Sequence, residues 1–244
     1  MKIKQVLGKI KKACEDYNLI EDGDKIAVGL SGGKDSITLL TCLAMLKKFY
    51  DKKFELSAIA IDLFDGKTDY SEMREYCKKF DVELIVINSN INKIVFEIRK
   101  ETHPSSLCAK LRRGFLNNNA MRLGFNKVAL GHHADDLMET LFMSLFFESR
   151  LCTFLPKMKL TNNPLYVIRP MILVYEKEIV AVSKDMPVIK NLCPADKHTQ
   201  REYMKQMIQN INKDIPDVQK NILSALLHPE RNHLFDKMFD KKSQ

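Results

Sequence analysis

The chain has 244 residues, which is enough for one large α/β domain with a smaller helical appendage. Its 39 Lys and Arg residues exceed its 31 Asp and Glu residues, and the net charge of +8 favours a polyanionic partner, with RNA more natural than a membrane surface. No apolar run approaches the roughly 20 residues of a membrane-spanning helix, so we expect no membrane partner.

The cellular compartment follows from the N-terminus and the cysteines. Met1–Lys4 leads directly into an amphipathic helix rather than a secretion signal. The six cysteines are widely scattered along the chain. We therefore expect a cytoplasmic protein whose cysteines are core residues, metal ligands or catalytic groups before they are disulfides.

Apolar periodicity predicts strands that alternate with helices. The predicted strands are 25–30, 56–62, 83–88, 127–131 and 165–170. The predicted helices are 3–18, 37–50, 69–80, 91–100, 108–123, 134–147, 176–185, 197–211 and 215–227. His103–Ser106 is expected to be a loop, because Pro104 and the serines break a helix.

This alternation predicts an α/β fold with a parallel twisted sheet, helices on both faces and a C-terminal helical appendix. Ligands in such sheets bind at the carboxyl ends of the strands, where the loops at 31–36, 62–66 and 131–135 should converge. We divide the chain into an N-terminal helix, an α/β domain, a C-terminal helical region and a charged tail, at 1–22, 23–172, 173–236 and 237–244.

The stretch that follows the first predicted strand has the character of a phosphate loop. It comprises Ser31, Gly32, Gly33, Lys34, Asp35 and Ser36. The glycines let backbone N–H groups approach a phosphate, the helix N-terminus favours negative charge, and Lys34 adds a cation. The spacing is not that of a Walker A loop, and a Gly-Gly turn with a solvated Lys-Asp pair is the bland alternative.

A second motif, Gly131-His132-His133-Ala134-Asp135-Asp136, lies where the fourth strand meets a helix. Its carboxylates are explained either by capping of the helix N-terminus or by Mg²⁺ binding beside the phosphate loop. We take Asp35 and Asp135 as the Mg²⁺ candidates, with Asp136 third. A zinc site at the paired histidines is disfavoured, because adjacent residues point apart.

The third motif surrounds Cys108. Its thiol is expected near a helix N-terminus beside Lys110, Arg112 and Arg113, which would favour the thiolate, although a buried structural cysteine is the alternative. The arginines offer bidentate contacts to phosphate of ATP or RNA. Cys193 is a second isolated cysteine, in a loop before a basic helix.

The order of the motifs resembles the tRNA 2-thiocytidine synthetase family, from about residue 25 to 235. The motifs are SGGKDS, S-x-L-C-x-x-L-R-R-G, L-G-H-H-x-D-D-x-x-E-T, V-I-R-P-M and N-L-C. The resemblance implies the PP-loop fold, which is adenine nucleotide alpha hydrolase-like, and an ATP- and Mg²⁺-dependent tRNA sulfurtransferase. Such enzymes adenylate the C2 carbonyl of an anticodon-loop cytidine, and sulfur then displaces AMP. The resemblance also implies a homodimer; the sulfur donor, a cysteine desulfurase or another source, is open.

The resemblance implies roles for the motif residues. The loop from Ser31 to Ser36 would hold the pyrophosphate, and Lys34 would stabilise phosphate charge. Asp62, Gly131 and His132 should frame the adenosine. Cys108 and Cys193 would handle sulfur, and Arg112 and Arg113 would steady the adenylated base or its phosphates.

The chain departs from the family at one position. Members hold a 4Fe–4S cluster by a Cys-x-x-Cys pair and a later cysteine, which match Ser105, Cys108 and Cys193 here, so the first ligand is a serine. Three explanations are open: an engineered replacement, a natural cluster site with Ser105 or Cys152 as ligand, and a cluster-free route. In the last, Cys108 and Cys193 carry a persulfide and resolve it by disulfide formation.

Rival functions are also open. A lysidine-type synthetase needs the phosphate loop but no cysteine pair. A nucleotide- or RNA-binding protein that has lost sulfur transfer is disfavoured by the intact Lys34, Asp35 and Asp135. A thiolase for a free nucleotide or another tRNA position is only mildly disfavoured by the charge.

Overall fold

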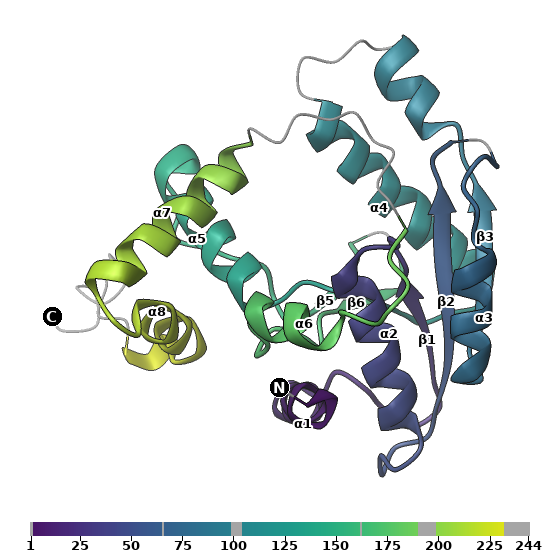
Figure 1. Cartoon of the computed structure of the whole chain (residues 1–244), viewed down its shortest axis with the longest axis horizontal. Coiled ribbons are helices and arrows are strands. Elements are labelled where there is room, and N and C mark those ends of the chain that lie inside the picture. The colour runs from purple at the N-terminus through teal and green to yellow at the C-terminus, as the bar shows by residue number, and fades with distance from the viewer. Residues whose placement is uncertain (1, 65, 99–103, 162, 190–198, 232–244) are drawn as a thin grey trace, which may run out of the picture. The chain divides into compact units, whose positions relative to one another are not determined.

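The computed structural model describes residues 2–64, 66–98, 104–161, 163–189 and 199–231 (Figure 1). For residues 96–98 and 104–106 the backbone alone is described. Cys193 therefore lies outside the described residues, and so does the predicted tail at 237–244.

One six-stranded sheet organises the chain. Its strands are β1 (Asp24–Gly29), β2 (Phe54–Asp62), β3 (Glu83–Asn88), β4 (Lys127–Ala129), β5 (Lys157–Lys159) and β6 (Tyr166–Ile168). The spatial order is β3-β2-β1-β4-β6-β5, and only β5 is antiparallel to its neighbour. The predicted α/β fold with a mainly parallel sheet is thus confirmed.

The helices follow the predicted order along the chain. They are α1 (Ile3–Asp16), α2 (Lys34–Lys47), α3 (Ser71–Lys79), the π-helical η1 (Lys93–Ile98), α4 (Pro104–Arg122), α5 (Ala134–Glu148), α6 (Glu176–Val182), α7 (Gln200–Asp214), α8 (Val218–Leu227) and the short 3₁₀ turn η2 (Pro229–Arg231). No helix in these described ranges combines the length and apolar character that crossing a membrane requires.

The two faces of the sheet are covered by different helices. On one face α2 and α3 are neighbours, since Thr41 Oγ1 lies 2.9 Å from Tyr76 OH. On the other face α4 contributes Cys108 and Leu116 to an apolar cluster with Ile59 of β2 and other sheet residues. Burial of these apolar side chains is the main force that holds helix to sheet.

A buried charge cluster ties the start of the sheet to the turn before it. Lys127 Nζ lies 2.7 Å from both Glu21 Oε2 and Asp24 Oδ2, and it donates to Leu19 O at 3.1 Å. The Lys127 side chain is 1% exposed, so these partners replace nearly all of its water. Hydrogen bonds from Lys127 and Lys157 in turn lower the pKa of Glu21 to about 2.

The prediction of a loop at His103–Ser106 was wrong for residues 104–106, and His103 lies outside the described residues. Residues 104–106 belong to α4, whereas Pro104 and the serines were expected to break any helix there. A proline is tolerated in the first turn, where its missing N–H has no helical acceptor in any case. Ser105 therefore belongs to the first turn of α4, and Cys108 lies a full turn inside the helix rather than at its N-terminus.

The chain divides into two compact units. The first contains residues 1–136 and 154–197, with the sheet, and the second contains 137–153 and 198–244. In the second unit Arg201 of α7 forms an ion pair with Glu139 of α5 at 3.1 Å. These units are defined by packing, so the division at 172/173 stays a prediction.

Candidate active site

The predicted phosphate loop, Ser31–Ser36, which is called the PP-loop below, joins β1 to α2 through hydrogen bonds of its two serines. Ser36 Oγ accepts from the Ser31 N–H at 3.1 Å and donates to Gly33 O at 3.0 Å, while Ser31 Oγ accepts from the Gly33 N–H at 3.2 Å. Gly32 has a φ of +82°, a region that glycine adopts without strain. These contacts fix the loop and occupy the N–H groups of Ser31 and Gly33, which leaves the N–H groups of the first turn of α2, which have no helical acceptor, for a phosphate.

Gly131 brings the second motif against this loop. A Cβ added at Gly131 would lie 3.1 Å from Asp35 C and 3.2 Å from both Asp35 O and Ser36 N. Only a residue without a side chain lets the end of β4 approach the first turn of α2 so closely. The structure thus places the SGGKDS and GHHADD motifs side by side, as expected for loops that follow neighbouring parallel strands.

Lys34 lies between two carboxylates. Its Nζ is 3.0 Å from Asp35 Oδ1 and 3.1 Å from Glu176 Oε1. Burial opposes the charged form, but Asp35 and Glu176 outweigh it, so the pKa of Lys34 is raised above its ordinary value. The ammonium is therefore charged at neutral pH and suited to contact a phosphate.

His133 is surrounded by three carboxylates. Its ring nitrogens lie 3.5 Å from Asp135 Oδ2, 3.5 Å from Asp136 Oδ2 and 4.0 Å from Asp35 Oδ1. Burial opposes protonation, but the nearby carboxylates of Asp135, Asp136 and Asp35 outweigh it and raise the pKa of His133. The same ring, together with the Glu176 N–H that donates to Asp135 at 2.7 Å, offsets burial and lowers the pKa of Asp135.

These carboxylates fit Mg²⁺ bound together with a nucleotide. Asp35 Oδ1 is buried and makes no hydrogen bond of good geometry, although Lys34 Nζ is nearby. In the described part of the chain no three side chains converge on a ready-made ion position. Mg²⁺ takes one or two carboxylates and completes its shell with phosphate oxygens and water, so Asp35 and Asp135 stay the predicted ligands.

Asp62 ends β2 and organises the loop that follows. Its carboxylate accepts hydrogen bonds from the Phe64 N–H at 3.0 Å, the Gly66 N–H at 2.7 Å and Thr68 Oγ1 at 2.7 Å. Burial would raise the pKa of Asp62, but these donors outweigh it and lower the pKa. The contact of Asp62 with adenosine stays a prediction, and the structure gives the carboxylate a role in shaping the loop.

Helix α4 carries the sulfur-related motif along the PP-loop. Arg112 Nη2 donates to Ser31 O at 3.4 Å. Leu116, one turn further, fits onto Gly29, where a Cβ would come within 2.7 Å of Leu116 Cδ2. Cys108, one turn before Arg112, is 9% exposed and packs in the apolar cluster. Its thiol is more buried than the sequence led us to expect.

The three positions that would hold an iron–sulfur cluster in the family carry only two cysteines in this chain. Ser105 stands at the first ligand position, Cys108 is buried, and Cys193 lies outside the described residues. Cys152 is exposed in the second unit, where its Sγ donates to Ser144 Oγ at 3.5 Å. A serine hydroxyl is a hard and poor ligand beside thiolates, so the donor set does not fit the three-cysteine cluster.

Several residues at the carboxyl edge had no role in the sequence-based expectations. Glu176 pairs with Lys34, His133 gathers the carboxylates, and Arg169 stacks on Phe154 with its guanidinium carbon 4.9 Å from the ring centroid. His132 packs against the same Phe154 ring, with 5.1 Å between the two ring centroids. The doubled histidine was visible in the sequence, but Glu176 and Phe154 had no motif to mark them.

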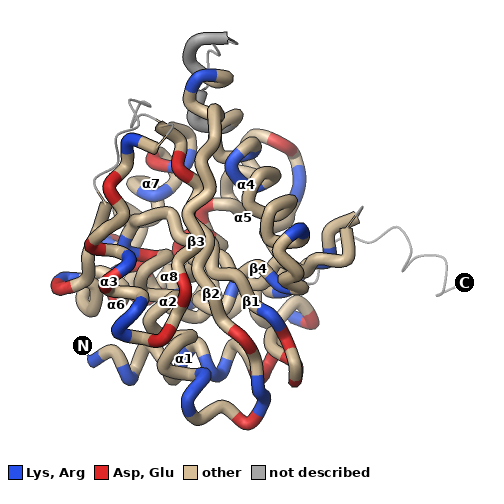
Figure 2. Tube along the Cα trace, turned by 90° about the vertical axis from the view of Figure 1, so that its right-hand side faces the viewer, with Lys and Arg blue, Asp and Glu red and all other residues tan. Residues whose placement is uncertain are grey.

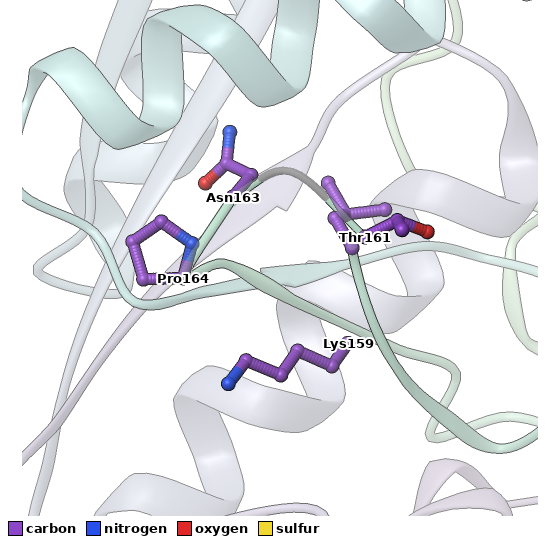
Figure 3. Close-up of a pocket in the computed structure, with 5 residues that line it drawn as sticks. Lys159, Thr161, Asn163 and Pro164 are labelled. Carbon is purple, nitrogen blue, oxygen red and sulfur yellow. The ribbon is translucent and has the colours of Figure 1, made fainter.

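Two pockets lie away from this edge. One has a volume of about 440 Å³ and is lined by Lys159, Leu160, Thr161, Asn163 and Pro164 (Figure 3). It lies at the turn before β6, which is the amino end of that strand. Another, of about 630 Å³, lies at the amino ends of β2 and β3. Because ligands of parallel sheets bind at the carboxyl ends, neither pocket is the nucleotide site.

Comparisons with known proteins agree with this geometry. A family model described as a PP-loop domain matches residues 2–211. A tRNA-cytidine(32) 2-sulfurtransferase of Aliivibrio fischeri is 38% identical over 245 aligned positions, covering 98% of this chain and 80% of that protein. Its counterpart in Yersinia pestis is 37% identical, with 98% and 78% covered.

A solved structure shows the same fold. The U34-tRNA thiolase NcsA from Methanococcus maripaludis with its 4Fe-4S cluster superposes with a TM-score of 0.74, covering 96% of this chain and 81% of that chain. Its sequence identity is 20%, so the likeness concerns the fold.

Proposed function

The chain belongs to the PP-loop family and, within it, to the family of tRNA-cytidine 2-sulfurtransferases, and from this premise we propose that it converts cytidine 32 of a tRNA to 2-thiocytidine using ATP. The observation that carries the proposal is the close approach of Gly131 to Asp35 and Ser36, which joins a phosphate loop to a carboxylate cluster. This arrangement suits in-line transfer of an adenylyl group, which needs positioning and charge stabilisation more than a side-chain nucleophile.

The first half-reaction is adenylation. The C2 oxygen of cytidine attacks the α-phosphorus of ATP, the bond from that phosphorus to the bridging oxygen breaks, and pyrophosphate leaves. Within Ser31–Ser36, the N–H groups that the serine hydroxyls do not engage would hold the departing pyrophosphate together with the Lys34 ammonium. Mg²⁺, held by Asp35 and Asp135, would neutralise phosphate charge.

For the second half-reaction we propose the cluster-free route, since the thiolates for a three-cysteine cluster are incomplete. One of Cys108 and Cys193 receives sulfur as a persulfide from a cysteine desulfurase. Its outer sulfur attacks C2, and AMP leaves with the electron pair of the C2–O bond. The other cysteine then attacks the inner sulfur, which forms a disulfide and leaves sulfur on C2. A thiol reductant restores the pair.

The chain supports this route in two places. Cys108 is four residues before Arg112, so both lie on one side of α4, and Arg112 reaches Ser31 O of the PP-loop. The Ile189 N–H donates to Gly32 O at 3.0 Å, so the segment that ends at Ile189 reaches the PP-loop, while Cys193 itself lies outside the described residues. A homodimer in a reducing cytoplasm belongs to the same proposal and rests on family membership.

The test is a reconstituted thiolation assay. The chain is incubated with ATP, Mg²⁺, cysteine, a cysteine desulfurase, a thiol reductant and an unmodified tRNA transcript. We expect pyrophosphate release and 2-thiocytidine, detected by mass spectrometry of the digested tRNA. The matched substrate is the same transcript with uridine at position 32, which should give neither product. Absence of pyrophosphate release with the cytidine transcript would refute the proposal.

The sulfur route has its own test. After anaerobic purification and reconstitution with iron and sulfide, we expect no stoichiometric iron and no brown visible absorbance of an iron–sulfur cluster. Cys108→Ser and Cys193→Ser should each abolish thiolation and leave tRNA-dependent pyrophosphate release intact. A bound cluster in the unaltered chain would overturn the cluster-free route while leaving the adenylation proposal in place.

A further inference from the structure

Arg169 is a buried cation with an incomplete set of partners. The residue follows β6 directly and is 4% exposed. Its Nη1 donates to Leu155 O at 2.6 Å, while Nε is buried without an acceptor. No carboxylate in the described ranges forms an ion pair with it. A buried charge in this condition is costly unless a ligand supplies the missing counter-charge.

The guanidinium is held in a fixed plane. Its carbon lies 4.9 Å from the centroid of the Phe154 ring. Phe154 in turn packs against His132, and the Leu155 carbonyl fixes the Nη1 side of the guanidinium. Nε lies on the other edge, and the described residues give Nη2 no acceptor, so that edge is available for the two parallel hydrogen bonds that a phosphate accepts.

A second arginine adds to the positive charge. Burial and the charge of Arg113 together lower the pKa of Arg169 to about 10, which leaves Arg169 protonated at neutral pH. Arg113 is exposed on α4. This helix carries Lys110, Arg112, Arg113 and Arg122 and no acidic residue, although acidic and basic residues are interspersed along most of the chain (Figure 2). Two like charges at this edge favour a bound anion.

We propose that Arg169 and Arg113 bind a backbone phosphate of the RNA substrate beside the reacting nucleotide. The proposal rests on the proposed function for its RNA. An ATP phosphate is the other source of the same chemistry, but the PP-loop follows β1, and β6 lies two strands away in the order β1-β4-β6. At about 4.8 Å per strand that is roughly 10 Å from the site that holds the triphosphate. The site therefore fits a second phosphate-bearing molecule.

The test is the salt dependence of tRNA binding by the full chain. Equilibrium binding of an unmodified tRNA transcript is measured over a series of salt concentrations for the unaltered protein, Arg169→Gln and Arg113→Gln. Loss of one phosphate contact in a single-stranded loop should reduce the slope of log K against log salt by about 0.7, and weaken binding at low salt roughly tenfold. Arg169→Lys, which keeps the charge, should restore most of the slope.

Two controls keep the outcomes separable. Arg122→Gln removes the same charge from the last turn of the same helix and should leave the slope unchanged. ATP affinity, measured by calorimetry, should stay within twofold of the unaltered protein for every variant. Because Arg169 is buried, Arg113→Gln, at an exposed position, carries the test if Arg169→Gln fails to fold.

The outcomes decide between the sources. An unchanged slope of log K against log salt for both Arg169→Gln and Arg113→Gln would overturn the proposed phosphate site. If Arg169→Gln weakens ATP binding and leaves the salt dependence of tRNA binding unchanged, Arg169 binds ATP, and the assignment to an RNA phosphate is overturned. An unaltered protein that binds no tRNA would overturn the proposed function together with this site. Reduced slopes with intact ATP binding are the expected result.

Discussion

Replacing Gly131 by alanine tests whether the close contact of the two motifs matters for adenylation. Gly131 does not belong to the glycines with positive φ, so its backbone conformation is open to alanine and the effect is purely steric. The new Cβ would meet backbone atoms of Asp35 and Ser36 at 3.1 to 3.2 Å. Ordinary carbon contacts lie at about 3.5 to 4.0 Å, so the end of β4 and the start of α2 must separate by roughly 0.5 Å.

The size of the effect follows from that displacement. Overpacking of this kind costs about 1 to 3 kcal/mol of folding free energy. A misplacement of 1 Å in a catalytic site costs about 100-fold in rate, so half that distance predicts roughly a tenfold slower adenylation. We expect Gly131→Ala to show both losses, because the same contact orders the PP-loop and supports the fold.

The assay is tRNA-dependent pyrophosphate release, with urea unfolding measured alongside. Gly8→Ala is the matched control, because a Cβ at Gly8 meets nothing within 4 Å and the residue lies inside α1. It should raise stability by about 0.5 to 1 kcal/mol and leave the rate unchanged. Gly131→Ala with an unaltered rate and unfolding free energy would refute the reasoning.

Three further predictions concern other parts of the first unit. Lys127→Met should lower the free energy of unfolding by about 3 kcal/mol in urea titrations, because it leaves Asp24, which is 3% exposed, without its cation; adding Asp24→Asn should recover part of the loss. The lowered pKa of Asp62 means that its carboxylate stabilises the fold above the unfolded-state value of about 3.9 and loses this contribution as pH falls through the lower folded-state pKa. The stability difference between the unaltered protein and Asp62→Asn should therefore shrink below pH ~4 in acid unfolding curves, and a constant difference would contradict this. Ser36→Ala removes the acceptor of one loop N–H and should raise the KM for ATP several-fold, with Ser36→Thr closer to the unaltered value.

Much of the fold was predictable because its signals are local. Buried runs such as Ile26–Val28 and the glycine turn after them specify a strand and a helix start without reference to the rest of the chain. The strand β5 was missed, since Lys157–Lys159 is three residues long and two of them are lysines. Only its pairing with β6 makes this segment a strand.

The candidate site was predictable as a set of motifs and not as a set of contacts. Strand ends of a parallel sheet meet at one edge, so the convergence of the loops that carry Asp35 and Gly131 followed from their position after predicted strands. The pairing of Lys34 with Glu176 joins residues far apart in sequence and has no local pattern. The orphaned Nε of Arg169 depends on the positions of Phe154 and Leu155, which only the folded chain defines.

The fit of Leu116 onto Gly29 has a consequence for how this family can vary. A Cβ at position 29 would lie 2.7 Å from Leu116 Cδ2 and 3.0 Å from Leu130 Cδ2, so there is no room for a side chain unless these residues shrink. Relatives with alanine or serine at position 29 should therefore carry a smaller residue at 116. The helix that bears Cys108 and the strand that leads into the phosphate loop would then be inherited as a matched pair, and exchanging either one alone between relatives should yield inactive hybrids.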